Sequence, residues 1–259
     1  MNKSISLSII MPTLNEEDNV HDAINETLRS FDNAKLNAEI IVVNDGSKDK
    51  TLEIIEKICK KDPRVRVISH DTPKGIGASF WDGVNNSNKD SICMLPGDGE
   101  NDPSEIIRYL GLLSHVDIVI PFVFNPQVRP LWRSALSWIY RWAVNTTFWV
   151  NFNYTNGTIL YRKKVLDELN HKNPGFFFQT DILIRSIRRG YLFAEVPYRL
   201  GLRGSGSSKA LSYPSFLGVI RGYLVLVRDF YFYKNCKFNA SFGSNTSTAL
   251  RYKSSQENQ

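Results

Sequence analysis

The chain reads SICMLPGDGENDP from Ser91 to Pro103, and this stretch indicates the class of fold. A short apolar run, typical of a buried strand, leads into an acidic turn and then a proline that suits a helix start. Similar apolar runs lie at residues 5–11, 39–44, 65–69 and 117–120, and the segments between them carry apolar residues at helical spacing. This alternation predicts an α/β fold with a mostly parallel sheet and helices on both faces.

Polar residues follow these strands directly. Ligands of parallel sheets bind beyond the carboxyl ends of the strands, so we expect a site there. Residues 15–18, which follow the first strand, are Asn-Glu-Glu-Asp, although acids are also typical of a helix N-terminus. Asp45 follows the second strand and is suited to accept hydrogen bonds from the N–H edge of a base. No GxGxxG follows the first strand, so a dinucleotide-binding fold is not favoured.

Three acids lie within five residues after the fourth strand. They are Asp98, Glu100 and Asp102, and they are costly to crowd unless they are solvated or bound to a cation. Mg²⁺ and Mn²⁺ take oxygen ligands and bridge to phosphates. Asp102 is expected to cap the helix that begins near Pro103, and an acidic capping turn is the alternative interpretation of the whole cluster. We expect Asp98 and Glu100 to bind a divalent metal ion.

The composition is that of a globular protein with a modest basic excess. Of its 259 residues 42% are hydrophobic and 22% charged, and the net charge is +6. This charge suits anionic partners such as nucleotide phosphates, anionic lipid or nucleic acid. Nucleic acid is the least expected of these, because the cations do not gather on one predicted helix or strand face. Cys59, Cys93 and Cys236 are too widely spaced for a CxxC metal site or a disulfide framework.

We expect a single domain over residues 1–236, followed by a Ser/Asn-rich tail at 237–259 that is expected to be disordered. Residues 1–120 form the expected nucleotide-binding part, and residues 121–236 the acceptor-side part. The apolar run at the start is too short for a signal peptide, and no uncharged stretch reaches the ~18 residues of a membrane span. These features predict a cytoplasmic protein.

Two later segments invite a membrane interpretation. Residues 129–150 hold four of the five tryptophans, and residues 214–233 are strongly apolar apart from Arg221, Arg228 and Asp229. Trp and Arg suit the interface of a bilayer, whereas aromatic helices also pack in cores and oligomer interfaces. The expectation is peripheral contact with the inner face of a membrane.

Six short motifs follow one another along the chain: Pro12–Glu17, Asn44–Asp49, Lys74–Ala78, Gly97–Glu100, Gly190–Pro197 and Arg203–Lys209. Each motif is loose alone, but their order and spacing are specific. This series resembles family 2 glycosyltransferases, and within that family most closely the dolichol-phosphate (polyprenyl-phosphate) mannosyltransferase type, over roughly residues 5–210.

The resemblance implies a Rossmann-like type A glycosyltransferase fold and an inverting hexosyltransferase that uses a nucleoside-diphosphate sugar and Mg²⁺ or Mn²⁺. It implies that Asp98 and Glu100 bind the metal, that Arg203 and Lys209 neutralise the leaving diphosphate, and that Asp181 is an acid near the acceptor. It also implies a nucleotide-sugar site formed by Pro12, Leu14, Glu16, Asp45, Asp71, Gly75 and Asp98.

The chain departs from the family pattern at two places. Pro96 replaces the first acid of the Asp-x-Asp metal motif, so the metal loses one usual ligand and Glu100 is expected to compensate. Residues 121–123 are Pro-Phe-Val where relatives tend to have Gly-Ser-Arg, so a contact to an acceptor phosphate is either missing or supplied by Arg129 or Arg133.

The expected activity is transfer of a sugar to a polyprenyl phosphate, or to a glycan or lipid hydroxyl, in cell-surface glycan synthesis. A hydroxyl acceptor would need Asp181 as a general base, whereas a phosphate oxygen is already anionic. A sugar nucleotidyltransferase is one alternative, but it would want a Gly-rich basic loop after the first strand, where this chain is acidic. A non-catalytic nucleotide-sugar-binding protein is the other, motivated by Pro96.

Overall fold

The structure is a computed structural model that describes residues 5–124, 131–199, 213–232, 242 and 246–257. Its centre is a seven-stranded sheet with the order β3-β2-β1-β4-β6-β5-β7. The strands are β1 (Leu7–Thr13), β2 (Ala38–Asn44), β3 (Val65–Ser69), β4 (Ser91–Met94), β5 (Ile118–Val123), β6 (Leu160–Arg162) and β7 (Phe193–Tyr198).

Strand β6 is the exception in a parallel sheet. It runs antiparallel to both β4 and β5, whereas the other neighbouring strands pair in parallel. The predicted mostly parallel sheet is therefore confirmed.

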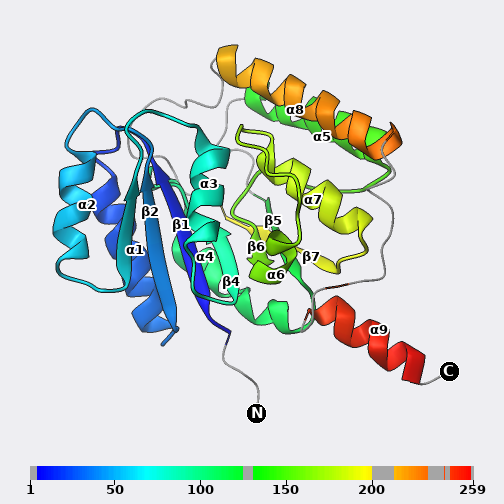
Figure 1. Cartoon of the computed structure of the whole chain (residues 1–259), viewed down its shortest axis with the longest axis horizontal. Helices are drawn as coiled ribbons and strands as arrows, with labels where there is room; N and C mark the ends of the chain where they lie inside the picture. The colour runs from blue at the N-terminus through cyan, green and yellow to red at the C-terminus, as the bar shows by residue number, and fades with distance from the viewer. Residues whose placement is uncertain (1–4, 125–130, 200–212, 233–241, 243–245, 258–259) are drawn as a thin grey trace.

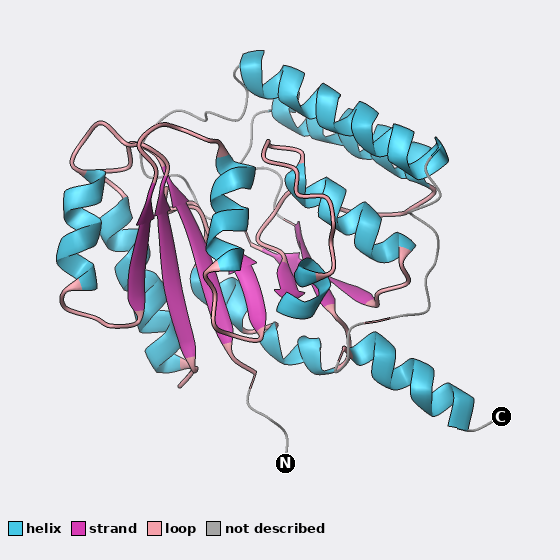
Figure 2. Ribbon diagram, in the orientation of Figure 1, coloured by secondary structure: helices cyan, strands magenta, loops and turns pink. Residues whose placement is uncertain are grey.

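Helices cover both faces of the sheet (Figure 2). One face carries α1 (Val20–Asn33), α2 (Thr51–Cys59), α4 (Pro103–Ile107) and the short 3₁₀ helix η1 (Leu110–Ser114). The other face carries α3 (Ile76–Asn85), α6 (Lys163–Asp167) and α7 (Phe178–Arg188). Helices α5 (Leu131–Phe148) and α8 (Tyr213–Phe232) lie side by side beyond α7 (Figure 1).

The strands are buried on both faces because their side chains alternate between two apolar cores. Ile10 and Ile41 belong to the core beneath α3, and Ile9 and Ile40 belong to the core beneath α1 and α2. All four side chains are completely buried. This explains why the strands read as continuous apolar runs rather than as alternating ones.

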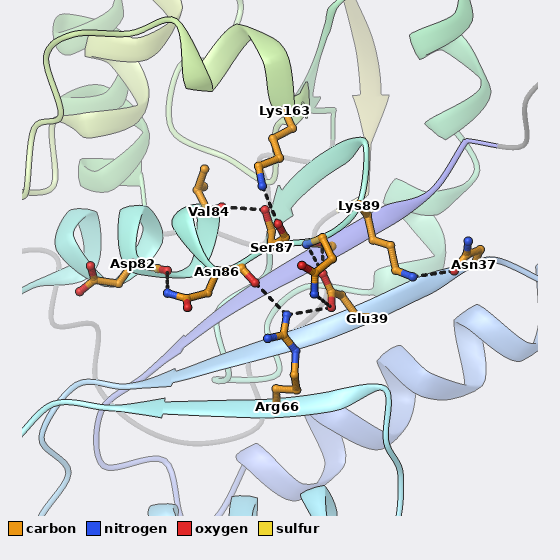
Figure 3. A network of polar contacts seen from close by, with 11 residues as sticks. Asn37, Glu39, Arg66, Asp82, Val84, Asn86, Ser87, Lys89 and Lys163 are labelled. Atoms are coloured by element: carbon orange, nitrogen blue, oxygen red, sulfur yellow. Dashed lines mark hydrogen bonds and ion pairs between the residues drawn. The ribbon is translucent and has the colours of Figure 1, made fainter.

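A polar network ties together the amino ends of β1, β2 and β3. The Glu39 carboxylate on β2 accepts hydrogen bonds from the Ser8 hydroxyl on β1 (2.7 Å), the Asn88 backbone N–H (2.7 Å) and the Arg66 guanidinium on β3 (2.9 Å). Arg66 also donates to the Asn86 carbonyl at the end of α3, as Figure 3 shows. A charge buried at this place is tolerated because it is paired and hydrogen-bonded.

Part of the expected disordered tail is ordered. Residues 247–257 form helix α9 (Ser247–Glu257), whose start packs against the body of the protein. The completely buried Asp117 accepts hydrogen bonds from the backbone N–H groups of Ser247 (2.7 Å) and Thr248 (2.9 Å). A carboxylate at a helix N-terminus satisfies N–H groups that have no partner within the helix. The polar composition of the tail indicated disorder and gave no sign of this capping contact.

None of the described helices is long and apolar enough to span a bilayer.

Candidate functional site

The carboxyl ends of β1, β2 and β4 meet at one edge of the sheet. The Asp45 N–H donates to the Thr13 carbonyl at 2.9 Å, and the Gly97 N–H donates to the Pro12 carbonyl at 3.1 Å. Pro12, Asp45 and the Gly97-Asp98 turn are thus held together by backbone bonds. The parallel register of the strands produces this convergence, which the sequence predicted from the position of each polar group.

The loop after β1 is fastened to the loop after β2. The backbone N–H of Asn15 donates to Ser47 Oγ at 2.9 Å, and the N–H of Glu16 donates to Thr51 Oγ1 at 2.8 Å. Asn15 in turn accepts from the Lys48 N–H at 2.8 Å and has a left-handed φ of 51°, a conformation that Asn tolerates. These bonds fix the backbone that carries Leu14 and Glu16, whose side chains are half-buried.

Asp45 is buried at the end of β2. Its Oδ1 lies 2.8 Å from His70 Nδ1 and accepts the Lys74 N–H at 2.8 Å, and its Oδ2 accepts the Gly75 N–H at 2.9 Å. The carboxylate therefore fastens the segment between β3 and α3 to the end of β2. Gly75 contributes to this contact only its backbone N–H. Asp71, in the same segment, is exposed.

Gly46 permits this close crossing of two loops. Its φ is +73°, and a Cβ at this position would lie 2.9 Å from the backbone nitrogen of Pro73 and from the backbone carbon of Thr72. Any other residue would force the segment away from β2.

His70 is a site residue that the sequence analysis missed. Its imidazole is buried, and its two nitrogens face two acids: Nδ1 faces Asp45, and Nε2 lies 2.9 Å from Oδ2 of Asp82 on α3. The available signal was a lone histidine directly after a predicted strand at the edge that carries the other site residues. Nothing in the sequence marked Asp82 as a site residue, because it lies within a helix and does not directly follow a strand.

The acidic turn after β4 separates into a cap and a pair of candidate metal ligands. Asp102 accepts the Ser104 N–H at 2.8 Å and caps α4, as predicted. Asp98 is half-buried, and its Oδ1 accepts the Glu100 N–H at 3.1 Å. Within the described ranges no group of three His, Cys, Asp or Glu side chains converges on one point.

This donor set fits a metal ion that is completed by a substrate. Mg²⁺ is usually held by one or two carboxylates together with substrate phosphates and waters, rather than by a cage of protein groups. The half-buried Asp98 carboxylate next to Glu100 meets that requirement, while the side chain at the position of the missing acid, Pro96, offers no oxygen.

Asp181 lies in the first turn of α7 and is 1% exposed. Both of its carboxylate oxygens lie 3.0 Å from Nε of Arg185 one turn later. Arg185 also pairs with Asp229 on α8 at 2.8 Å. Burial raises the pKa of Asp181 above its ordinary value, although Arg185 and His171 act in the opposite direction.

Arg129, Arg203 and Lys209 lie outside the residues that the structure describes, as does the side chain of Arg133.

Helices α5 and α8 expose several large apolar side chains, which we call the aromatic face. Arg221 and Arg228 are also exposed on α8. The aromatic face consists of Leu136, Trp138, Ile139, Trp142, Phe216, Leu217, Ile220 and Leu224, each at least 40% exposed. Exposed apolar patches of this kind mark protein or membrane interaction sites.

The chain resembles known proteins in sequence and in fold. Its residues 8–170 match the model of glycosyl transferase family 2. It is 28% identical over 216 residues to dolichol-phosphate mannosyltransferase from Pyrococcus furiosus, covering 79% of this chain and 59% of that protein. It is 27% identical over 213 residues to undecaprenyl-phosphate mannosyltransferase from Micrococcus luteus, covering 77% of this chain and 85% of that protein.

A solved structure shares the fold at low identity. Glucosyl-3-phosphoglycerate synthase from Mycobacterium tuberculosis, in complex with Mg²⁺ and uridine diphosphate, superimposes with a TM-score of 0.64 at 18% identity, covering 87% of this chain and 79% of that chain. The predicted type A glycosyltransferase fold is thereby confirmed.

Proposed function

The chain belongs to glycosyl transferase family 2 and is a glycosyltransferase, and we propose that it transfers a sugar from a nucleoside-diphosphate sugar to a polyprenyl phosphate. The observation that carries this proposal is the position of Asp45 and of the Gly97-Asp98 turn at the carboxyl ends of β2 and β4, where backbone hydrogen bonds join both to β1. Parallel sheets bind ligands at this edge. The names of two relatives supply the class of acceptor.

The nucleoside is proposed to bind against β1 and β2. Pro12, Leu14 and Glu16 would line the base and ribose, and Asp45 would accept a hydrogen bond from the base. Asp71 and Gly75 would border the pocket from the segment before α3. Support comes from the hydrogen bonds between these loops, because loops that are already fixed lower the entropic cost of binding.

Asp98 and Glu100 are proposed to hold Mg²⁺ or Mn²⁺ against the diphosphate. When bound, the metal ion neutralises charge that develops on the leaving diphosphate. Arg203 and Lys209 are proposed to neutralise the same group, which is the electrostatic assistance that this kind of reaction needs most. Pro96 leaves the metal with fewer protein oxygens, so we expect metal binding to be strong only when the nucleotide is present.

The state of Asp181 supports a phosphate acceptor over a hydroxyl acceptor. A general base must reach the proton that it removes, and Asp181 is buried with both oxygens on Arg185. A lipid phosphate needs no base. Its anionic oxygen would attack the anomeric carbon in line, the bond from that carbon to the diphosphate oxygen would break, and the diphosphate would leave with the electron pair, inverting the configuration. Arg129 or Arg133 would bind the acceptor phosphate.

The aromatic face is proposed to rest on the surface of a membrane that holds the lipid acceptor. Trp and Leu side chains favour the interface of a bilayer, and Arg221 and Arg228 suit anionic headgroups. This is peripheral contact by helices that lie on the surface.

Thermal unfolding with UDP, GDP, CDP or ADP, each with and without Mn²⁺, tests the proposal. A ligand that binds only the native state stabilises it by RT ln(1 + [L]/Kd), about 2.7 kcal/mol at a hundredfold excess over Kd. A metal-dependent shift with one nucleotide is expected and would name the class of donor. A flat response from folded protein would refute the nucleotide site.

A further inference from the structure

His70 links two carboxylates that belong to different elements. Its side chain is 3% exposed, with Nδ1 2.8 Å from Asp45 Oδ1 and Nε2 2.9 Å from Asp82 Oδ2. The charged groups that face this cluster are Asp45 at the end of β2, Asp82 on α3, and Lys74, whose Nζ lies 3.9 Å from Asp82 Oδ2. The imidazole therefore joins the site edge of the sheet to α3.

Satisfying both acids requires a proton on each ring nitrogen. A neutral imidazole has one N–H and one lone pair, so one of the two carboxylates would then face a lone pair. With both nitrogens protonated, each carboxylate receives a charge-assisted hydrogen bond, which is the stronger kind. A ring that donates from both nitrogens therefore satisfies Asp45 and Asp82 together.

The bonds to Asp45 leave room for one more donor. An ionised carboxylate has about four acceptor positions. Among the described residues, Oδ1 receives two donors, His70 and the Lys74 N–H, whereas Oδ2 receives the Gly75 N–H. The remaining acceptor position is on Oδ2. His70 occupies Oδ1 and so fixes the direction in which Oδ2 points.

We propose that His70 is a positioning residue for recognition of the base: it holds Asp45 so that Oδ2 presents one acceptor to an N–H of the base, and Asp82 holds His70 in turn. This inference rests on the proposed nucleotide site. Through His70, the segment between β3 and α3 would affect affinity for the base rather than the transfer step. His70 contacts neither Asp98, which is proposed to bind the metal at the diphosphate, nor Asp181.

Two substitutions separate the two bonds of His70. The amide nitrogen of Asn can replace Nδ1, whereas the longer Gln side chain places its amide near Nε2. His70→Asn keeps a donor for Asp45, and His70→Gln keeps one for Asp82. His21→Gln is the matched control, because His21 is exposed on α1. Kd for the nucleoside diphosphate that stabilises the wild type is measured by calorimetry on folded protein, so that a change in stability does not enter.

We expect His70→Gln to raise Kd about tenfold, as loss of a hydrogen bond to a charged group does. His70→Asn should raise it less than about threefold, and His21→Gln should leave it unchanged. Equal losses in the two His70 variants, or no loss in His70→Gln, would overturn the proposal. If Asp45→Asn leaves binding unchanged in the same assay, the proposed base contact itself fails, which is a separate result.

The difference between the two His70 variants is a readout that a merely structural role would not move, because only His70→Asn keeps a donor for Asp45.

Discussion

Nη2 of Arg185 lies 2.8 Å from Oδ2 of Asp229, and this ion pair joins α7 to α8. Nε of the same guanidinium contacts both oxygens of Asp181 at 3.0 Å. The acid that the sequence places near the acceptor is thus held by an arginine that reaches the helix carrying part of the aromatic face. Asp181 is engaged inside the protein, which bears directly on the class of acceptor.

Replacement of Asp181 by Asn tests that class. For a phosphate acceptor we expect kcat to fall less than about tenfold, because no proton has to be removed from the nucleophile. A loss of about 10²–10⁴-fold in kcat, with the melting temperature little changed, is the effect of removing a general base and would contradict the phosphate assignment. Steady-state kinetics and thermal unfolding of the same preparation give both quantities.

Asp98→Asn should abolish the metal-dependent part of nucleotide binding. Loss of a metal-coordinated stabilisation of the leaving group is expected to lower kcat by about 10²-fold or more. Asp102→Asn, two residues beyond Glu100 and in the same turn, is the control: Asp102 caps α4 and Asn is an equally good cap. Equal behaviour of the two variants in a Mn²⁺ titration would argue against a metal at Asp98.

Glu39 lies far from the candidate site, and we expect its contribution to stability to be lost in acid. Burial alone raises its pKa, but the Asn88 N–H, the Ser8 hydroxyl and Arg66 more than offset this, so its pKa lies below the ordinary 4.5. The folded pKa is the lower one, so the stabilisation is complete above the unfolded pKa and disappears as pH falls through the folded pKa.

Glu39→Gln should therefore lower the free energy of unfolding by about 1–3 kcal/mol at neutral pH. In urea titrations the difference from the wild type should shrink as pH falls below the ordinary pKa of 4.5. A difference that does not change with pH would show that Glu39 acts through its shape and not its charge.

The aromatic face predicts binding to anionic vesicles. Leu224→Glu should weaken co-sedimentation with them about tenfold or more, because it removes an apolar side chain that would enter the bilayer interface and adds a charge that anionic lipid repels. Leu250→Glu is the matched control: Leu250 on α9 is 57% exposed and Leu224 59%. Equal binding of the two variants would show that the aromatic face does not contact lipid.

Gly77 tests the packing of α3 against the segment before α7. A Cβ at Gly77 would lie 2.6 Å from the backbone carbon of Pro174, whereas a Cβ at Gly111 would meet nothing within 4 Å. Gly77→Ala is expected to cost about 1–3 kcal/mol of stability, and Gly111→Ala to cost little or to stabilise slightly. Urea unfolding compares the two, and equal stabilities would contradict the close contact.

The sequence predicted the sheet and the site edge because both depend on local patterns. Apolar runs located β1, β2 and β4, and the acids directly after them gave Asp45 and Asp98. The antiparallel direction of β6 was not predictable from its composition, since it depends on how the chain returns between β4 and β5. Helix α9 was missed because its cap, Asp117, is 130 residues away in sequence.

The contacts of His70 could not be predicted either, because they also join residues that are far apart in sequence. Asp45 and Asp82 are 25 and 12 residues from it, and only the crossing of the loop over Gly46 brings the three together. Sequence motifs identify candidate site residues, but they do not reveal which side chains already have a partner inside the protein. Asp181 is an example, because it is paired with Arg185.

The most direct test of the account is transfer of labelled sugar into an organic phase. The protein is incubated with Mn²⁺, a polyprenyl phosphate in detergent micelles, and sugars carried by the nucleotide that stabilises it. We predict that label enters the organic phase, and that Asp98→Asn prevents this. Label that stays in the aqueous phase with every polyprenyl phosphate offered, although the nucleotide binds, would contradict the proposed acceptor.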